Sequence, residues 1–435
     1  MTALDGHPVL SAPPYQVELT RPLPLLRGTG SVDLLVKLHG HPLGTVRVPL
    51  DKPDFDVSRL AQAIAQRLAN PIREHLAGDD LAGDGSAADS PVVDAARLEA
   101  GLPDSQSCRR PSTSLDVSVV VTAIEASDSL RRTLAALARQ STPPAEVLLV
   151  DNRPTTSGIP AMLEDLPELP EPPRYVPEHR KGLSYARNAG LNAARSEIVA
   201  FTDDDVLLDE SWLDALAAPF EAGPEIVCSS GLILPLVLAT GAQLLFEEFG
   251  GFSKGFEMRR FDLEKHRGDG PLYPFNAGQF GSGANSAFRT SFLREIGGFD
   301  EMLGTGTPAR GGEDLDLFLE VLGHGGTIVY QPAAVLWHEH HADMAQLEKQ
   351  LFAYGVGLGA MLTKRLVTRP EERRQIFRKA PEGLRYLLGT RSEKNARKTT
   401  SYPRRLTLLE LAGVATGPIA YARSTRARSR RSWAP

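Results

Sequence analysis

Three stretches of the sequence decide the fold class: VSVVVTAI at 117–124, EVLLVD at 146–151 and EIVAFTDDD at 197–205. Each is a short, nearly continuous apolar run, typical of a strand that is buried on both faces of a sheet. Helices are expected between them, the first after an N-cap at Asp128 and the second over about 183–195. Strands that alternate with helices predict a parallel sheet with right-handed crossovers, and therefore an α/β domain.

Acidic residues follow two of the predicted strands. Asp151 ends the second stretch, and Asp203, Asp204 and Asp205 end the third. Ligands of such sheets bind at the carboxyl ends of the strands. Three adjacent carboxylates repel one another, by about 1 kcal/mol per close pair in a partly wet site, unless a cation lies among them. Their hard oxygen ligands suit Mg²⁺ or Mn²⁺. The alternative is an acidic turn that caps the helix starting near Asp209.

Six blocks of the chain carry a family resemblance. They are VVVTAIEASDSLRRTL (119–134), EVLLVDN (146–152), KGLSYARNAGLNAARSEIVAFTDDDV (181–206), GSGANSAFR (281–289), GGFDEMLGTGTPARGGEDLDLFLEVLGHGG (297–326) and IVYQPAAVLWHEHH (328–341). In this order and spacing the segment resembles the nucleotide-sugar glycosyltransferases of family 2, over roughly half of the chain. One block alone is a weak signal, whereas six in the family's order are specific. The resemblance implies a GT-A type fold, with a Rossmann-like, mostly parallel sheet flanked by helices.

The resemblance also implies how the acidic residues bind a nucleotide sugar. TDDD would be the family's DxD element, with Asp205 as the main ligand of Mg²⁺ or Mn²⁺ and Asp203 as a further ligand. Asp203 and Asp204 would also contact the ribose and metal-bound water. Asp151 matches the position that accepts a hydrogen bond from the base. His338, within WHEHH, matches a histidine that contacts the metal or the diphosphate. A structural carboxylate, a turn aspartate and a structural histidine are the alternatives. HEHH lacks the spacing of the HExxH zinc signature, which excludes a metalloprotease.

The Glu313-Asp314 pair follows a glycine-rich loop and opens a helix. Acids in a first helical turn complement the helix dipole, and this alone would explain one carboxylate. Family 2 enzymes invert the anomeric centre, and the resemblance makes Asp314 the base that deprotonates the acceptor hydroxyl. Glu313 would support the geometry of the acceptor or the metal. In a single displacement the metal replaces the general acid, because it stabilises the departing diphosphate.

Cations and glycines complete the predicted site. Lys181 and Arg187 would place positive charge near the diphosphate; alternatively Arg187 pairs with a buried acid and Lys181 is solvated. In GSGAN, Gly283 would let the backbone approach the sugar beside Asn285, because glycine has no side chain to obstruct it. A plain β-turn is the alternative there.

The first block departs from the family pattern. Thr122-Ala123-Ile124-Glu125 stands where relatives commonly show proline or cysteine, then threonine, then a basic or polar pair. We expect Thr122 and Glu125 to contact the nucleotide, but differently, so the base and the sugar are not determined. No GxGxxG turn or Walker loop occurs, which disfavours a dinucleotide oxidoreductase or a P-loop enzyme.

Composition divides the chain into three regions: an N-terminal α+β module with its linker (1–115), the glycosyltransferase domain (116–345) and a helical, basic C-terminal region (346–435). The first has β-rich runs at 32–38 and 45–50, a turn at His39-Gly40-His41-Pro42 and an amphipathic helix at 57–76, but no chemical motif. Two cysteines, Cys108 and Cys228, are too few for a disulfide framework or a cysteine-rich zinc site.

The charge is uneven. The formal net charge is −6, yet the part from Lys364 onwards holds 19 basic and 5 acidic residues. A wholly basic nucleic-acid binder is excluded, and the arginines of the tail lack interleaved aromatics, so we expect no nucleic-acid partner. The sequence has no signal-peptide pattern and no long apolar run. We expect a cytoplasmic protein, whose basic tail either lies on the inner face of the cell membrane or is solvated. On an anionic membrane each basic residue would contribute about 1 kcal/mol of binding free energy.

The sequence thus predicts a metal-dependent inverting glycosyltransferase that takes a nucleotide-sugar donor and a glycan, lipid-linked or small-molecule acceptor, in the synthesis of a cell-surface glycan or glycoconjugate. One rival is a nucleotidyltransferase that makes a nucleotide sugar and releases pyrophosphate; no glycine-rich signature follows the first strand, which argues against it. The other is a non-catalytic module of the same fold that binds a glycan or a partner protein. The presence of Asp205, Asp314 and His338 argues against this second rival.

Overall fold

The computed structural model describes residues 9–10, 14–28, 30–50, 56–78, 94–105, 108, 110–165, 171–389 and 392–431. The chain forms two compact units, Met1–Ser112 with Gly255–Glu257, and Thr113–Lys254 with Met258–Pro435. Each is described by itself. The helices of the predicted C-terminal region belong to the second unit.

The first unit is a small sheet covered by helices. Its strands are β2 (Gln16–Glu18), β4 (Ser31–Leu38) and β5 (His41–Pro49) in the order β2-β4-β5, and its helices are α1 (Val57–Gly78) and α2 (Ala95–Ala100); β1 (Val9–Leu10) pairs with β3 (Leu25–Leu26). The predicted helical stripe of Leu60, Ile64, Leu68 and Ile72 is buried, as expected. The predicted four-residue turn is wrong in extent, because Leu38 pairs with His41 and only His39-Gly40 connect the strands.

The second unit is built on a mixed sheet in the order β10-β14-β11-β13-β9-β6-β7-β8, with β12 paired to β14. The bounds are β6 (Val117–Ala123), β7 (Glu146–Asp151), β8 (Arg174–Pro177), β9 (Ile198–Asp203), β10 (Val206–Leu208), β11 (Ile226–Pro235), β12 (Arg259–Phe261), β13 (Asn285–Arg289) and β14 (Thr327–His338). Strands β9, β6, β7 and β8 are mutually parallel, whereas β13 is antiparallel to both neighbours. The predicted α/β class with a mostly parallel sheet is confirmed.

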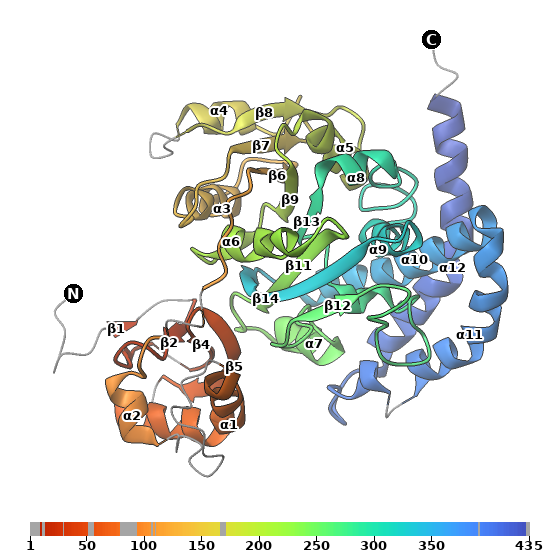
Figure 1. Cartoon of the computed structure of the whole chain (residues 1–435). Coiled ribbons are helices and arrows are strands. Elements are labelled where there is room, and N and C mark those ends of the chain that lie inside the picture. Colours follow the sequence, from red (N-terminus) through yellow and green to blue (C-terminus); the bar gives the residue numbers. More distant parts are fainter. Residues whose placement is uncertain are drawn as a thin grey trace. The chain divides into compact units, whose positions relative to one another are not determined.

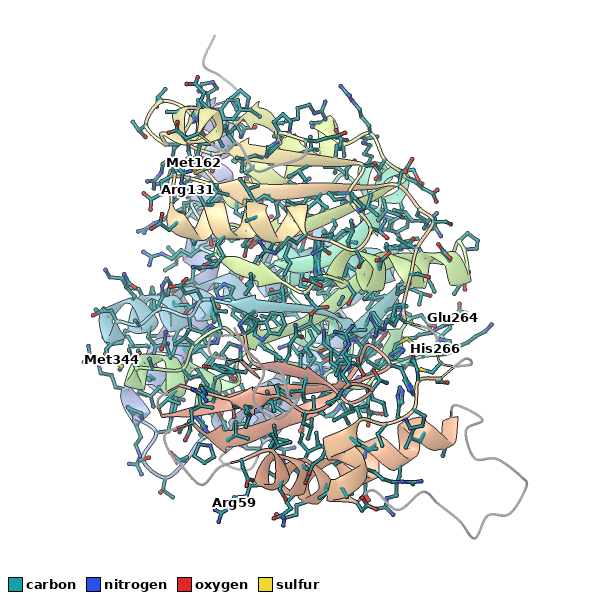
Figure 2. The ribbon with its side chains drawn as sticks, turned by 90° about the vertical axis from the view of Figure 1, so that its left-hand side faces the viewer. Arg59, Arg131, Met162, Glu264, His266 and Met344 are labelled. Carbon is teal, nitrogen blue, oxygen red and sulfur yellow. The ribbon has the colours of Figure 1, made fainter. Side chains whose placement is uncertain are left out.

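Helices cover both faces of this sheet (Figure 1). One layer contains α3 (Asp128–Ala138), α4 (Ile159–Glu164) and α6 (Trp212–Ala217), and the other contains α5 (Leu183–Ala193), α8 (Thr290–Glu295) and α9 (Glu313–Gly323). Figure 2 shows the first layer from outside, with Arg131 on α3 and Met162 on α4. Because strands such as β6 are buried on both faces, their sequences are continuous apolar runs rather than alternating ones.

The remaining helices are α7 (Gly241–Phe249), α10 (Met344–Thr368), α11 (Pro370–Leu388) and α12 (Arg404–Arg431). Helices α10 and α12 meet through glycines, and a Cβ added at Gly359 would lie 2.3 Å from the carbonyl oxygen of Val414. Gly417 on α12 contacts Gly359 in the same way. The backbones therefore approach where side chains are missing. Within the described residues, no helix combines the length and the apolar character needed to cross a membrane.

The glycine contact predicts the effect of one methyl group. Gly359→Ala should lower the stability of the second unit by about 1–3 kcal/mol, because the new Cβ overlaps backbone that cannot rotate away. Gly323→Ala, at the end of α9, is the matched control, because its Cβ meets no atom within 4 Å. Thermal melting compares the two. A Gly359→Ala protein that melts at or above the wild-type temperature would contradict this account of the contact.

Candidate active site

The acidic turn between β9 and β10 lies beside the end of β14. Asp203 ends β9, Asp204 and Asp205 form the turn, and the next residue, Val206, pairs with His338 in the sheet. Ligand atoms of Asp203, Asp205 and His338 therefore lie within 4.8 Å of one another. His338 Nε2 is 3.4 Å from Asp205 Oδ1, although the two residues are far apart in sequence. This arrangement gathers two carboxylates and one imidazole at a strand end, as the sequence predicted.

The cluster has the chemistry of a divalent-metal site. Among the described residues, Asp205 Oδ1 and His338 Nδ1 are buried and have no hydrogen-bond partner. Burial, and then the neighbouring carboxylates, raise the pKa of both Asp204 and Asp205 to about 7. Burial, and then His340, lower the pKa of His338 to about 4, so its imidazole is neutral at pH 7 and can donate a lone pair. A cation among these groups would hold the acids ionised and give Asp205 Oδ1 a partner.

Arg187 connects this cluster to the Glu313-Asp314 pair. Its guanidinium, with only 3% of the side chain exposed, donates to Asp203 Oδ1 at 3.2 Å and to Glu313 Oε1 at 3.0 Å. Burial lowers the pKa of Arg187, but Asp203, Glu313 and Asp314 outweigh this and leave it raised. The cation thus pairs with buried acids, which is the alternative that the sequence left open for it.

Helix α9 presents the Glu-Asp pair. It starts after Gly312, whose φ of 83° suits a residue without a Cβ. Burial, and then Asp314, raise the pKa of Glu313 to about 7. Asp314 is half-buried, and its two oxygens accept hydrogen bonds from the backbone N–H groups of Gly283 at 3.0 Å and Leu315 at 2.8 Å. Two rigid donors therefore fix the orientation of this carboxylate.

Gly283 lies between the side chains of Arg187 and Asp314. A Cβ at this position would lie 2.7 Å from Arg187 Nη1 and 3.0 Å from Asp314 Cβ. Position 283 therefore requires a glycine. The atoms that leave no room for a side chain belong to Arg187 and Asp314 and not to a sugar. The segment holds Asp314 close to Arg187.

Two residues that were predicted to contact the nucleotide sugar have protein neighbours instead. Asn285 is fully buried, accepts a hydrogen bond from Trp212 Nε1 at 2.8 Å and donates to the carbonyls of Leu232 and Ala334. It joins β11, β13 and β14 in the core, so the expected contact with the sugar is corrected to a structural role. Asp151 is also fully buried and accepts from the N–H of Arg153, from the Ser157 hydroxyl and from the Tyr175 hydroxyl. This is the turn arrangement that the sequence left as its alternative.

The other predicted residues lie around the acidic turn and α5. Thr122 is buried and pairs with Asp203 across β6 and β9. Glu125 is exposed, and its charge contributes to raising the pKa of Asp204. Lys181 is exposed just before α5, where the Gly182 N–H donates to Asn152. Their contacts with a ligand remain predictions.

The sequence did not point to two further groups near the site. Burial lowers the pKa of Lys254 to about 8, while Asp314 and Glu247 oppose that change. Burial, and then Asp314, raise the pKa of Tyr354 on α10. Lys254 belongs to no recognisable motif, and Tyr354 lies beyond the resembling segment, so no signal in one sequence could have found them.

Comparison with known proteins agrees with the geometry. Residues 118–297 match the family model "Glycosyl transferase family 2". The pre-mycofactocin glycosyltransferase of Mycobacterium tuberculosis is 28% identical over 177 residues, covering 41% of this chain and 34% of that protein. The glucosyl-dolichyl phosphate glucuronosyltransferase of Haloferax volcanii is 25% identical, covering 44% and 58%. The solved mannosyltransferase PcManGT of Pyrobaculum calidifontis, in complex with GDP-Man and Mn²⁺, aligns with a TM-score of 0.41 and 16% identity over 87% of this chain and 88% of that one.

The aligned part is thus about a third of the length of the mycobacterial relative and 58% of the archaeal one. The match to the family model, residues 118–297, contains the acidic turn, Arg187 and Gly283, whereas the Glu-Asp pair and His338 follow it in the chain. The segment 118–297 belongs to glycosyl transferase family 2, as its sequence blocks predicted.

Proposed function

We propose that this protein transfers a sugar from a nucleoside-diphosphate sugar to an acceptor hydroxyl, with inversion and with the help of Mg²⁺ or Mn²⁺. One observation carries the proposal: the Arg187 guanidinium bonds both Asp203 of the acidic turn and Glu313 of the Glu-Asp pair. Metal-ligating groups and a candidate base, which come from distant parts of the chain, therefore belong to one site. A metal-assisted inverting transfer uses both: the base activates the acceptor hydroxyl, and the metal stabilises the departing diphosphate.

Asp205, Asp203 and His338 would hold the divalent ion. The donor set fits such an ion, because it contains hard carboxylate oxygens and a neutral imidazole, and because Asp205 Oδ1 is buried without a hydrogen-bond partner. When bound, the ion supplies positive charge that stabilises the departing diphosphate. Arg187 is committed to Asp203 and Glu313, so its part is to hold these two carboxylates near one another rather than to bind phosphate.

Asp314 would act as the general base. The acceptor hydroxyl gives its proton to the Asp314 carboxylate while its oxygen attacks the anomeric carbon, and the bond from that carbon to the diphosphate oxygen breaks on the opposite face. The N–H groups of Gly283 and Leu315 orient the carboxylate for this transfer. Glu313 remains paired with Arg187, which leaves one acid of the pair to face the acceptor.

For the acceptor we propose only a chemical class. The names of the relatives indicate pre-mycofactocin as the acceptor in one case and glucosyl-dolichyl phosphate in another. A glycan, a lipid-linked sugar or a small molecule with a free hydroxyl therefore stays our proposal, in glycan or glycoconjugate synthesis.

On α11 the exposed Phe377, Leu384 and Leu388 accompany several arginines, which supports peripheral contact with an anionic membrane. Equal co-sedimentation of wild type and Phe377→Glu with anionic liposomes would reject that contact.

Replacement of Asp314 tests the base. Asp314→Asn should lower kcat by about 10²–10⁴, because the amide keeps the size of the side chain but cannot accept the proton. Binding of the nucleoside diphosphate should be unchanged. Glu295→Gln, at an exposed position on α8, is the matched control and should keep wild-type turnover. The assay follows release of nucleoside diphosphate; unchanged turnover in Asp314→Asn would exclude this base, and release of pyrophosphate would favour a nucleotidyltransferase.

Replacement of His338 tests the metal site without an activity assay. His338→Ala should weaken binding of Mn²⁺ at least tenfold, because it removes one of three ligands. Electron paramagnetic resonance reports the free Mn²⁺ in a titration of the full chain with a nucleoside diphosphate present. The neighbouring exposed His341→Ala is the control and should bind as the wild type does. Equal affinities for all three proteins would remove His338 from the site.

A further inference from the structure

The first unit contains a second cluster of metal-binding side chains, which the glycosyltransferase chemistry does not use. His39 lies in the turn between β4 and β5, His75 in the last turn of α1, and Cys108 in the segment after α2. One ligand atom from each lies within 4.8 Å of the others. Three distant segments of the unit therefore converge on one point. No local sequence motif marks this cluster, because 36 and 33 positions separate His75 from the other two residues.

The distances are those of a tetrahedral metal site. His39 Nδ1 is 3.1 Å from His75 Nε2, and Cys108 Sγ is 3.5 Å from His75 Nε2. Ligands at usual Zn–N and Zn–S distances lie about 3.3 Å apart for two nitrogens and about 3.5 Å apart for nitrogen and sulfur in a tetrahedron. The observed separations differ from these by no more than about 0.2 Å. These two separations, and a third of at most 4.8 Å between His39 and Cys108, are compatible with a Zn²⁺ ion bound by all three residues.

A neighbouring carbonyl sets the tautomer of His39. Its Nε2 lies 3.1 Å from the carbonyl oxygen of Pro103, which can only accept, so Nε2 carries the proton. In the neutral ring Nδ1 then has a lone pair, and this atom faces His75 and Cys108. A ring nitrogen fixed by a carbonyl behind it is the usual arrangement of a metal-ligating histidine. The His41 ring also borders His75, with ring centroids 5.4 Å apart.

A tight turn fixes the backbone position of His39. This residue has a φ of 54°, and the next residue, Gly40, has a φ of 80°. Such two-residue turns favour asparagine or aspartate followed by glycine, and histidine is also among the residues enriched at positive φ. The carboxylate of Glu18 holds the turn by accepting from the N–H groups of both residues.

We propose that His39, His75 and Cys108 form a Zn²⁺ site in the first unit. Thiolate and imidazole ligands select Zn²⁺ over Mg²⁺ or Mn²⁺, so this site differs in metal from the acidic cluster around Asp205. Bound zinc would tie the β4–β5 turn to the end of α1 and to the segment of Cys108. The site is independent of the proposed transferase reaction.

Cobalt(II) tests the site, because a thiolate ligand gives Co²⁺ a charge-transfer band in the near ultraviolet and the acidic cluster contains no sulfur. The reduced, metal-free full chain should bind one equivalent of Co²⁺ with this band, and Zn²⁺ should displace it. Cys108→Ser should abolish the band and weaken Zn²⁺ binding about a hundredfold or more, since loss of outer-shell partners alone costs 10- to 100-fold.

Further variants show which residues bind the Co²⁺ that gives rise to the band. Cys228→Ala removes the other cysteine, which is fully buried in β11, and should keep the band. His338→Ala should also keep it. In the His338→Ala background Zn²⁺ should raise the melting temperature, and added Cys108→Ser should abolish that rise. The half-buried His75→Gln is a second ligand variant, and circular dichroism checks the metal-free fold of each. A wild-type protein without the band, or a band that survives Cys108→Ser, would overturn the proposal.

Discussion

The ion pairs of one buried guanidinium hold the candidate active site together. Arg187 bonds Asp203 at one end of its fork and Glu313 at the other, and it is almost completely shielded from solvent. Without this cation the carboxylates of the acidic turn and of α9 would repel one another across a desolvated space. Removing one partner of a buried ion pair lowers the free energy of unfolding by about 3–5 kcal/mol. The planar fork of arginine suits this double contact, whereas the point charge of lysine does not.

The fold supplies the other constraint. The acidic turn joins β9 in the middle of the sheet to β10 at its edge, and β10 pairs with the end of β14. His338 consequently lies beside Asp205, at a position fixed by sheet register rather than by a flexible loop. Gly283 completes the link between the two halves of the site, because its missing side chain leaves room for Arg187 and Asp314. Rigid elements therefore position both the metal-ligating groups and the candidate base.

Sequence reasoning identified the sheet, the acidic turn and the Glu-Asp pair, because buried parallel strands and strand-end acids leave clear patterns. It misjudged Asn285, since the sequence cannot tell an amide that lines a cleft from one that ties three strands together. It also passed over His39, His75 and Cys108, whose proximity depends on how a hairpin, a helix end and a connecting segment pack. Tertiary contacts of this kind require coordinates, however regular the local pattern is.

Anomalous diffraction from crystals grown with Mn²⁺ and a nucleoside diphosphate tests the central claim most directly. The account predicts a manganese peak in contact with Asp205 and His338, with the diphosphate on the same ion and the Asp314 carboxylate across an open space that a sugar can fill. A peak elsewhere, or a nucleotide bound away from the acidic turn, would contradict it.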